Sequence, residues 1–304
     1  MNIGVVGGGL MGHGIAYLLA VAGHDVRIYE PSAEVRATIP QRIEAIAVLL
    51  EDDPAHLKRI AVHDQLAPAV TDTDFVFEAA PEKLPLKQQI FADLEKHTRP
   101  DTILASNSSA LPSTEIGRHL KHRERVVGTH FWNPPHLVPL VEVIQTEWTS
   151  EEVVQRTMTL LREAGRSPVH VRRDIPGFIG NRLQHALKRE AIALVADGIA
   201  DAETIDTVIK DGFGARLAVL GTFEQTDLVG VNLTLDIHET LLAHLDRSTE
   251  PHPLLREKVE QGKLGMRTGE GFRKWTPEQA QAVRDRLARY LADAAKARKR
   301  CGET

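Results

Sequence analysis

The stretch Ile3–Gly12, with the sequence IGVVGGGLMG, decides the fold class. An apolar run leads into Gly7, Gly9 and Gly12, and a run with helical apolar spacing, Ile15–Ala22, follows directly. A G-x-G-x-x-G loop between a strand and a helix predicts a dinucleotide-binding unit. In such a unit the first glycine permits a tight turn, the second lets the backbone approach a diphosphate, and the third lets helix and strand pack closely. The helix N-terminus then offers free N–H groups to the diphosphate.

An acidic residue after the second strand-like run indicates which dinucleotide binds. Val26–Tyr29 predicts that strand, and Glu30 follows Gly12 by 18 residues. A carboxylate accepts hydrogen bonds from a ribose diol but repels a 2′-phosphate, and no arginine follows Glu30 directly. We therefore predict that NAD rather than NADP is the cofactor, contacted by the glycines, Leu10, Met11 and Glu30.

The composition is that of an ordinary globular protein. The chain has 304 residues, of which 42% are hydrophobic and 26% charged, and its formal net charge is −5. This charge gives no reason to expect nucleic acid or an anionic membrane as a partner. A single cysteine, Cys301, is typical of a reducing compartment, and the strand-like run near residue 3 leaves no room for a signal peptide. We predict a cytoplasmic protein without a metal site.

Strand-like and helical patterns alternate up to residue 175, after which only helical patterns follow. This predicts an α/β, Rossmann-type NAD-binding domain over residues 1–175 and an all-helical C-terminal domain over 176–304. Pro176-Gly177 is the expected hinge, with the substrate cleft between the domains. A single helix is expected over Leu228–Leu245. A basic, alanine-rich helix is expected at Thr276–Lys299 and is interpreted as a solvated terminal helix.

Two neighbouring strand-like runs, Val126–Phe131 and Leu140–Ile144, carry His130 and Glu142. If these strands pair antiparallel, the two side chains come within reach of each other. A carboxylate that accepts the imidazole N–H fixes the orientation of the ring and stabilises the imidazolium. This pattern predicts His130 as a general base, since histidine is the usual base near neutral pH.

Ser109 follows a third strand-like run, Thr102–Ala105, and could serve as a nucleophile. The chain has no G-x-S-x-G elbow, however, and a hydrolase would leave the glycine loop unexplained. A serine hydroxyl can instead hydrogen-bond a substrate alcohol. Asn181 lies on the polar face of the helix that begins near Phe178, where the alternatives are solvent exposure and donation to a substrate oxygen.

Together these motifs resemble the L-3-hydroxyacyl-CoA dehydrogenases, including their gulonate dehydrogenase, lambda-crystallin-like and vitamin B6-degradation relatives. The resemblance rests on the glycine loop with Glu30 and on four later motifs: Ser106–Ser109, Gly128–Pro134 with Leu140–Glu142, Pro176–Arg182 and Lys263–Phe272. It implies that His130 is the general base, that Glu142 orients it, and that Ser109 and Asn181 bind the substrate. It also implies cofactor contacts at Ala80, Glu82, Lys87 and Arg267, and a homodimer formed through the helical domain.

Three departures from the family pattern bear on the substrate. Relatives that use CoA carry a lysine-rich helical arm after the second strand, whereas the corresponding segment here, Ile46–Asp53, ends in three acids. Ser109 is followed by Ala110 instead of a second serine. Pro134–Pro139 and Gly214–Gly221 resemble the branch that oxidises free hydroxy acids, and Arg216 could pair with a substrate carboxylate.

Three functions are therefore compared. The first is oxidation of L-3-hydroxyacyl-CoA by NAD to 3-oxoacyl-CoA and NADH, in fatty acid metabolism. The second is an NAD-dependent dehydrogenase of a small hydroxy acid or alcohol without CoA, of the gulonate or pyridine-carboxylate type. The third is a catalytically silent, crystallin-like structural protein, against which the intact set Ser109, His130, Glu142 and Asn181 argues.

Overall fold

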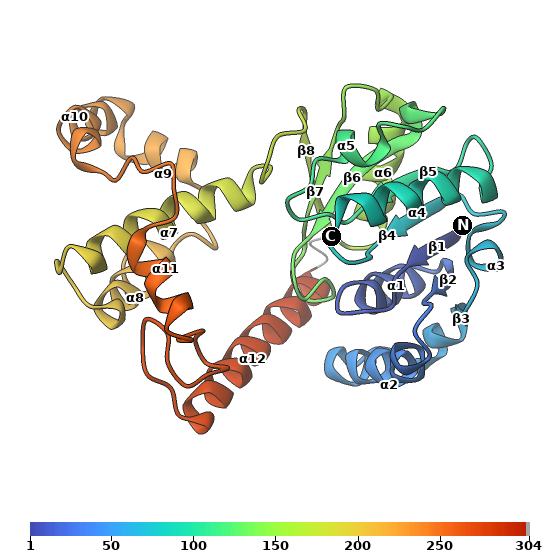
Figure 1. Cartoon of the computed structure of the whole chain (residues 1–304), viewed down its shortest axis with the longest axis horizontal. Coiled ribbons are helices and arrows are strands. Elements are labelled where there is room, and N and C mark those ends of the chain that lie inside the picture. Colours follow the sequence, from blue (N-terminus) through green and yellow to red (C-terminus); the bar gives the residue numbers. More distant parts are fainter. Residues whose placement is uncertain (302–304) are drawn as a thin grey trace. The chain divides into compact units, whose positions relative to one another are not determined.

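The computed structural model describes residues 1–301, except for the side chain of Cys301. It contains two compact units (Figure 1). The first comprises Met1–Gly180 and the chain from Leu287 onward, and the second comprises Asn181–Arg286. The boundary that we expected between residues 175 and 176 stays a prediction.

The first unit is built on one eight-stranded sheet with the order β3-β2-β1-β4-β5-β6-β7-β8. Strands β1 to β6 are parallel, β7 pairs antiparallel with β6, and β8 is parallel to β7. The strand order reverses at β1, which is where ligands bind in open α/β sheets. The strands are β1 (Asn2–Val6), β2 (Asp25–Tyr29), β3 (Ile60–His63), β4 (Phe75–Glu78), β5 (Ile103–Ser106), β6 (Val126–Phe131), β7 (Leu140–Ile144) and β8 (Ser167–Val171).

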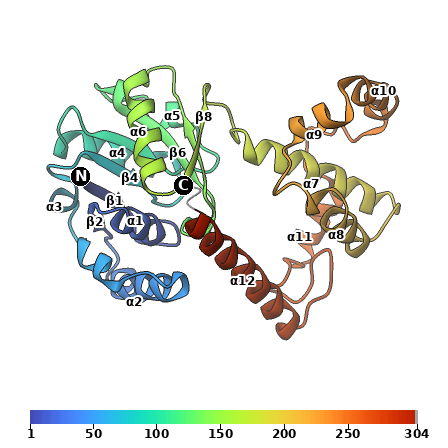
Figure 2. The ribbon, with the colours of Figure 1, turned by 180° about the vertical axis from the view of Figure 1, so that it is seen from behind.

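Helices cover both faces of this sheet (Figures 1 and 2). Alternate strand residues face opposite sides: Phe75 and Phe77 belong to one apolar cluster, and Val76 belongs to the other. The central strands therefore carry apolar residues toward both faces, as expected for a sheet covered on both sides. One face packs against α1 (Gly12–Val21), α2 (Ala33–Leu50) and α6 (Glu151–Glu163), and the other against α3 (Leu66–Val70), α4 (Leu84–His97) and α5 (Ser113–Gly117). The α/β Rossmann fold predicted from the sequence is confirmed.

The second half of α12 (Pro277–Cys301) corrects the expectation of a solvated terminal helix. Ala292 and Ala295 are 4% and 7% exposed and join the core cluster that contains Leu50. At the end of α2, Lys296 contacts Glu51 at 2.5 Å and Lys299 contacts Asp52 at 2.5 Å. The small alanines, three residues apart, let this face of the helix pack closely while the lysines reach the acids beside it.

The second unit is helical, and the expected helix over Leu228–Leu245 is broken. Gly230 has a φ of 102°, a conformation that L-residues rarely adopt, and it separates α9 from α10. No helix in the described residues is long and apolar enough to cross a membrane. The helices of this unit are α7 (Gly180–Ala196), α8 (Ala202–Asp211), α9 (Thr222–Val229), α10 (Val231–Leu241) and α11 (Pro253–Glu260).

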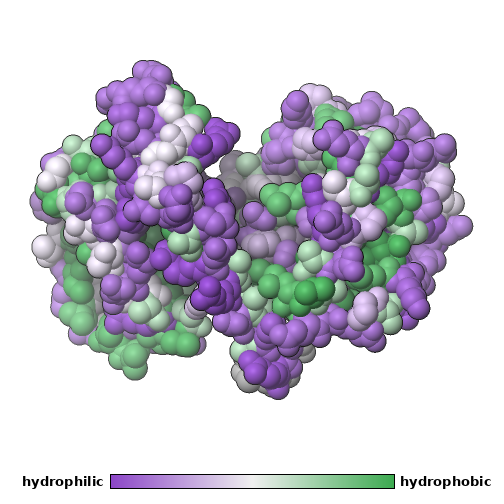
Figure 3. Space-filling model, turned by 90° about the horizontal axis from the view of Figure 1, so that it is seen from below, coloured by the Kyte–Doolittle hydropathy of each residue, from purple (hydrophilic) through white to green (hydrophobic). Residues whose placement is uncertain are grey.

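Helices α7 to α11 bury none of their described residues. Large apolar side chains lie on the surface of this unit instead, as the green areas on the left of Figure 3 show. Val219, Phe223 and Leu228 are 85%, 84% and 74% exposed. Exposure on this scale is typical of a surface that another protein covers.

Candidate active site

His130 and Glu142 lie directly opposite each other on the antiparallel strands β6 and β7. The Nδ1 atom of His130 is 2.8 Å from Oε2 of Glu142, and the two residues are 5% and 1% exposed. The strand pairing that we expected from the sequence therefore occurs, and it brings the imidazole and the carboxylate together. The ring of His130 also packs against Trp132 and Phe178, with centroid distances of 5.5 Å to each.

The second oxygen of Glu142 is fixed by the backbone. Its Oε1 accepts hydrogen bonds from the N–H groups of Ile179 at 2.9 Å and Gly180 at 3.0 Å. Burial alone raises the pKa of Glu142, but the hydrogen bonds from His130, Gly180 and Ile179 outweigh it and the pKa lies below its usual value. An ionised carboxylate only accepts hydrogen bonds, so Nδ1 of His130 carries the proton and Nε2 keeps the lone pair that a base needs.

The loop that carries Ser109 is held by Glu82. Oε1 of Glu82 accepts hydrogen bonds from the Ser108 hydroxyl at 2.6 Å and from the backbone N–H groups of Ser109 at 3.0 Å, Ala110 at 2.9 Å and Leu111 at 3.2 Å. Burial opposes ionisation of Glu82, yet the hydrogen bonds from Ser108, Ala110 and Leu111 lower its pKa overall. Glu82 thus fixes the position of the Ser109 backbone.

Sequence reasoning missed Asn107, which connects this loop to the histidine strand. Its Oδ1 accepts a hydrogen bond from the backbone N–H of Phe131 at 2.9 Å. Strands β5 and β6 are parallel neighbours, so Ser109, which follows β5, and His130, near the end of β6, lie toward the same edge of the sheet. The available signal was its place inside the Ser106–Ser109 motif, and its burial explains why it needs a hydrogen-bond partner.

Lys87, on α4, is fully buried. The sequence pattern of this helix does not predict that burial. Its ammonium donates to Oε1 of Glu78 at 2.6 Å and to the carbonyl of Ala80 at 3.2 Å, and it lies 3.6 Å from Oε2 of Glu82. Glu78 is also buried and accepts a hydrogen bond from Ser106 at 2.8 Å. The described contacts of Lys87 are therefore with protein groups beneath the loop, and its contact with the cofactor stays a prediction.

The glycine loop connects β1 to α1 and fits a bound dinucleotide. Gly7 has a φ of 97°, and a Cβ at Gly12 would lie 1.7 Å from the carbonyl oxygen of Gly7. These two glycines are thus required by the protein itself. A Cβ at Gly9 would meet no protein atom within 4 Å. The space in front of Gly9 is open, as the close approach of a diphosphate to the backbone requires.

Glu30 follows β2 and supports the same loop. It is 8% exposed, and its carboxylate accepts hydrogen bonds from the backbone N–H groups of Gly8 and Ser32, both at 2.9 Å. Each carboxylate oxygen keeps acceptor capacity for a ribose hydroxyl. In the same loop, Leu10 is 66% exposed, so the protein leaves most of this residue uncovered.

Two substitutions in the loop should separate its structural glycine from its ligand-binding one. Gly12→Ala forces a Cβ against backbone that cannot move away, so we expect a loss of stability of at least about 1–3 kcal/mol. Gly9→Ala leaves the protein unstrained and should preserve the melting temperature while raising the Kd for NAD at least about tenfold. Thermal unfolding and NAD titration of both variants measure this difference. Equal behaviour of the two variants would contradict the assignment.

The remaining predicted site residues belong to the second unit. Asn181 lies in the first turn of α7, Arg216 directly follows the short 3₁₀ helix Phe213–Ala215, and Arg267 lies in the loop after α11. Arg216 and Arg267 are exposed. Their roles toward substrate and cofactor stay predictions.

A dinucleotide loop at the switch point of the sheet and a buried histidine–carboxylate pair define a class of protein, the nicotinamide-dependent dehydrogenases. Comparisons with known proteins define the class further. The 3-hydroxyacyl-CoA dehydrogenase NAD-binding domain matches residues 2–175, and the C-terminal domain of the same family matches residues 177–275. The chain belongs to the 3-hydroxyacyl-CoA dehydrogenase family and is an NAD-dependent oxidoreductase that acts on CH–OH donors.

The proteins similar to this chain include a pyridine-carboxylate dehydrogenase and a 3-hydroxybutyryl-CoA dehydrogenase. The 5-formyl-3-hydroxy-2-methylpyridine 4-carboxylate 5-dehydrogenase of Mesorhizobium japonicum is 35% identical, over 95% of this chain and 96% of the relative. A probable 3-hydroxybutyryl-CoA dehydrogenase of Bacillus subtilis is 37% identical, over 89% of this chain and 96% of the relative.

One solved structure of each kind is also similar to this chain. A crystal structure of the pyridine carboxylic acid dehydrogenase, described as an NAD+-dependent dismutase, has a TM-score of 0.91 and 33% identity, with 97% of each chain covered. The (S)-3-hydroxybutyryl-CoA dehydrogenase of Ralstonia eutropha has a TM-score of 0.74 and 30% identity, covering 90% of this chain and 99% of that one.

Proposed function

We propose that this protein uses NAD to oxidise the CH–OH group of a small carboxylic acid or alcohol that carries no CoA. The observation that carries this proposal is the end of α2. Glu51 and Asp52 present carboxylates there, and Lys296 and Lys299 of α12 pair with them. CoA-using relatives are expected to have a lysine-rich arm in this segment, whereas Ile46–Asp53 contains no lysine or arginine and its acids pair with α12, so the segment itself offers no cation to CoA phosphates.

Similarity to the pyridine-carboxylate dehydrogenase supports the same choice. That structure covers 97% of this chain, whereas the Ralstonia eutropha structure covers 90%. The second candidate is the L-3-hydroxyacyl-CoA dehydrogenase that we ranked first from the sequence. It is favoured by the Bacillus subtilis relative, and a role in fatty acid metabolism depends on it.

The chemistry follows from the protonation of the His130–Glu142 pair. Nε2 of His130 takes the proton from the substrate hydroxyl, so the oxygen becomes a carbonyl oxygen as hydride leaves the carbon. Bound NAD supplies the acceptor for that hydride. Glu142 stabilises the imidazolium that His130 becomes, because its carboxylate stays ionised within hydrogen-bond distance.

The surrounding residues have proposed roles in binding. Ser109 donates a hydrogen bond to the substrate oxygen, and Glu82 keeps its loop in position. Asn181 and Arg216 are proposed to contact the substrate. Ala80, Glu82, Lys87 and Arg267 are proposed to contact the cofactor or to support the segments that do.

A substrate screen tests this function. Purified protein with NAD is supplied with free hydroxy acids, with hydroxymethyl and formyl pyridine carboxylates, and with 3-hydroxybutyryl-CoA, and NADH formation is followed by absorbance. We expect turnover of at least one free acid and none of the thioester. Turnover of the thioester alone would support the second candidate, and a protein that binds NAD but turns over neither would support the silent, crystallin-like function.

We also propose that the protein is a homodimer formed through the helical unit, because α7 to α11 lack a buried core and a second copy would cover their apolar side chains. Light scattering should give twice the chain mass of 33.6 kDa. Phe223→Glu should yield monomers or a large loss of stability, whereas Val48→Glu, at a comparably exposed position of the first unit, should stay dimeric. A monomeric wild-type protein would contradict the proposed dimer.

A cytoplasmic location stays a prediction that cell fractionation can test.

A further inference from the structure

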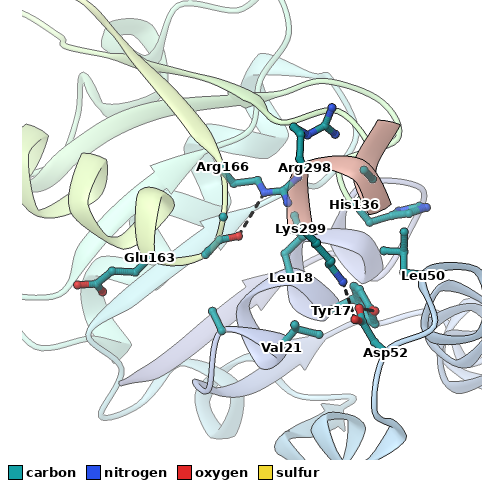
Figure 4. Close-up of a pocket in the computed structure, with 14 residues that line it drawn as sticks. Tyr17, Leu18, Val21, Leu50, Asp52, His136, Glu163, Arg166, Arg298 and Lys299 are labelled. Carbon is teal, nitrogen blue, oxygen red and sulfur yellow. Dashed lines mark hydrogen bonds and ion pairs between the residues drawn. The ribbon is translucent and has the colours of Figure 1, made fainter. Parts of the chain in front are cut away.

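A cavity of about 210 Å³ lies in the first unit where the second half of α12 meets α1 and the turn between α6 and β8 (Figure 4). None of the glycine-loop residues, Ser109, His130 or Glu142 lines it, so it is separate from the site described above. Its apolar lining includes Leu18, Val21, Leu50 and Ala295, and its cationic lining comprises Arg166, Arg298 and Lys299. A water molecule fills about 30 Å³ of the liquid, so the cavity has room for a small organic molecule.

The two arginines of this cavity have no carboxylate partner among the described residues. Arg166 donates only to backbone carbonyls, those of Ala164 at 3.3 Å and of Pro135 and Val138 at 3.4 Å each. Arg298 donates to the carbonyl of Leu137 at 2.8 Å. Burial and the charge of Arg298 lower the pKa of Arg166 to about 10, so it is still a cation at neutral pH.

Neither acid at the cavity neutralises these arginines. Asp52 pairs with Lys299 at 2.5 Å and accepts a hydrogen bond from the Tyr17 hydroxyl. The carboxylate of Glu163 points away from Arg166 in Figure 4. Burial lowers the pKa of His136, which also lines the cavity, to about 4, so this imidazole is neutral and adds no positive charge. Within residues 1–301, two half-buried guanidinium groups thus lie near each other without a carboxylate partner, an arrangement that costs free energy unless an anion is supplied.

We propose that this cavity binds a small organic anion whose carboxylate or phosphate group is held by Arg166 and Arg298. Guanidinium groups bind both kinds of oxyanion through paired N–H donors, and both arginines have N–H groups that form none of the hydrogen bonds described for residues 1–301. The apolar body of the ligand lies against Leu18 and Val21. Because Arg298 belongs to α12 and Arg166 to the turn before β8, the bound anion strengthens the attachment of α12 to the first unit.

The test is calorimetric titration and thermal unfolding with inorganic phosphate and, separately, with benzoate. Saturating NAD is present throughout to fill the dinucleotide loop, and sodium chloride keeps the ionic strength constant. We expect saturating benzoate or phosphate to raise the unfolding midpoint by about 2–5 °C. Binding of phosphate alone identifies a phosphate-bearing ligand, and binding of benzoate alone or more tightly identifies a carboxylate on an apolar body. No binding of either anion would overturn the proposal.

Variants distinguish this cavity from the active site. Arg166→Gln should weaken binding of the anion at least about tenfold, with Arg298→Gln as the second variant if the first does not fold. Arg162→Gln, an exposed arginine on α6 outside the cavity, is the matched control and should bind as the wild type does. Glu163→Gln should leave affinity unchanged or increase it. Undiminished binding by folded Arg166→Gln and Arg298→Gln proteins would overturn the proposal, because the anion would then occupy another site.

Discussion

His130→Gln should lower kcat/KM by about 10²–10⁴-fold, the range expected for loss of a general base. The glutamine side chain fills similar space but cannot take a proton near neutral pH. The affinity for NAD should stay within a few-fold of the wild-type value, because the described hydrogen bond and ring contacts of His130 are with Glu142, Trp132 and Phe178 and not with the glycine loop. The loss should therefore be in kcat. Steady-state kinetics and an NAD titration measure the two effects separately.

A matched control for this substitution is His170→Gln. His170 is a half-buried histidine on β8 of the same sheet, where its Nε2 lies 3.0 Å from Oε1 of Gln145. It has no part in the proposed chemistry, so its loss should leave kcat/KM nearly unchanged. If both histidine variants lost activity equally, or if His130→Gln turned over normally, the base would have been assigned to the wrong residue.

Glu142→Gln should lower kcat by about 10²–10⁴-fold, because His130 then adopts the wrong tautomer for a general base. The amide has one acceptor and one donor group, whereas the carboxylate accepts on both oxygens. The backbone N–H groups of Ile179 and Gly180 require the acceptor, so the amide NH₂ faces Nδ1 of His130. Nδ1 must then be unprotonated, and the proton moves to Nε2, where the base is needed. Glu147→Gln, an exposed carboxylate just after β7, is the control and should behave as wild type.

The same variant changes the acid stability. Because the pKa of Glu142 is lower in the folded protein, its interactions stabilise the fold fully above the unfolded pKa of about 4.3. This contribution is lost as the pH falls through the lower folded pKa. Melting temperatures measured from neutral pH into acid should therefore fall less steeply for Glu142→Gln than for wild type. Parallel curves would show that the carboxylate is not stabilised as described.

The sequence was sufficient for the sheet and for the centre of the site. Strands with apolar residues on both faces and a glycine loop of fixed spacing follow from local patterns, and the loop marks the switch point. The contact between His130 and Glu142 was also predictable, because a short connection favours antiparallel pairing and the register then aligns the two residues.

Contacts between residues far apart in the sequence were harder to predict. The burial of the Lys87 ammonium against Glu78 was not predictable, because only the fold brings that partner near, while its contact with the cofactor stays a prediction. Likewise, the second half of α12 looked solvated because its alanines and lysines are typical of an exposed helix. Their partners, Leu50, Glu51 and Asp52, are more than two hundred residues away in the chain, and no local pattern records such a contact. The exposure of the apolar surface of α7 to α11 was not predictable for another reason. The amphipathic spacing of a helix is the same whether its apolar face packs against the same chain or against a second protein.

The most direct test of the account compares kcat/KM for the best free acid with kcat/KM for 3-hydroxybutyryl-CoA, in one assay at saturating NAD. We predict that the free acid has the higher value and that its turnover depends on His130. A higher value for the thioester would contradict the proposed substrate class.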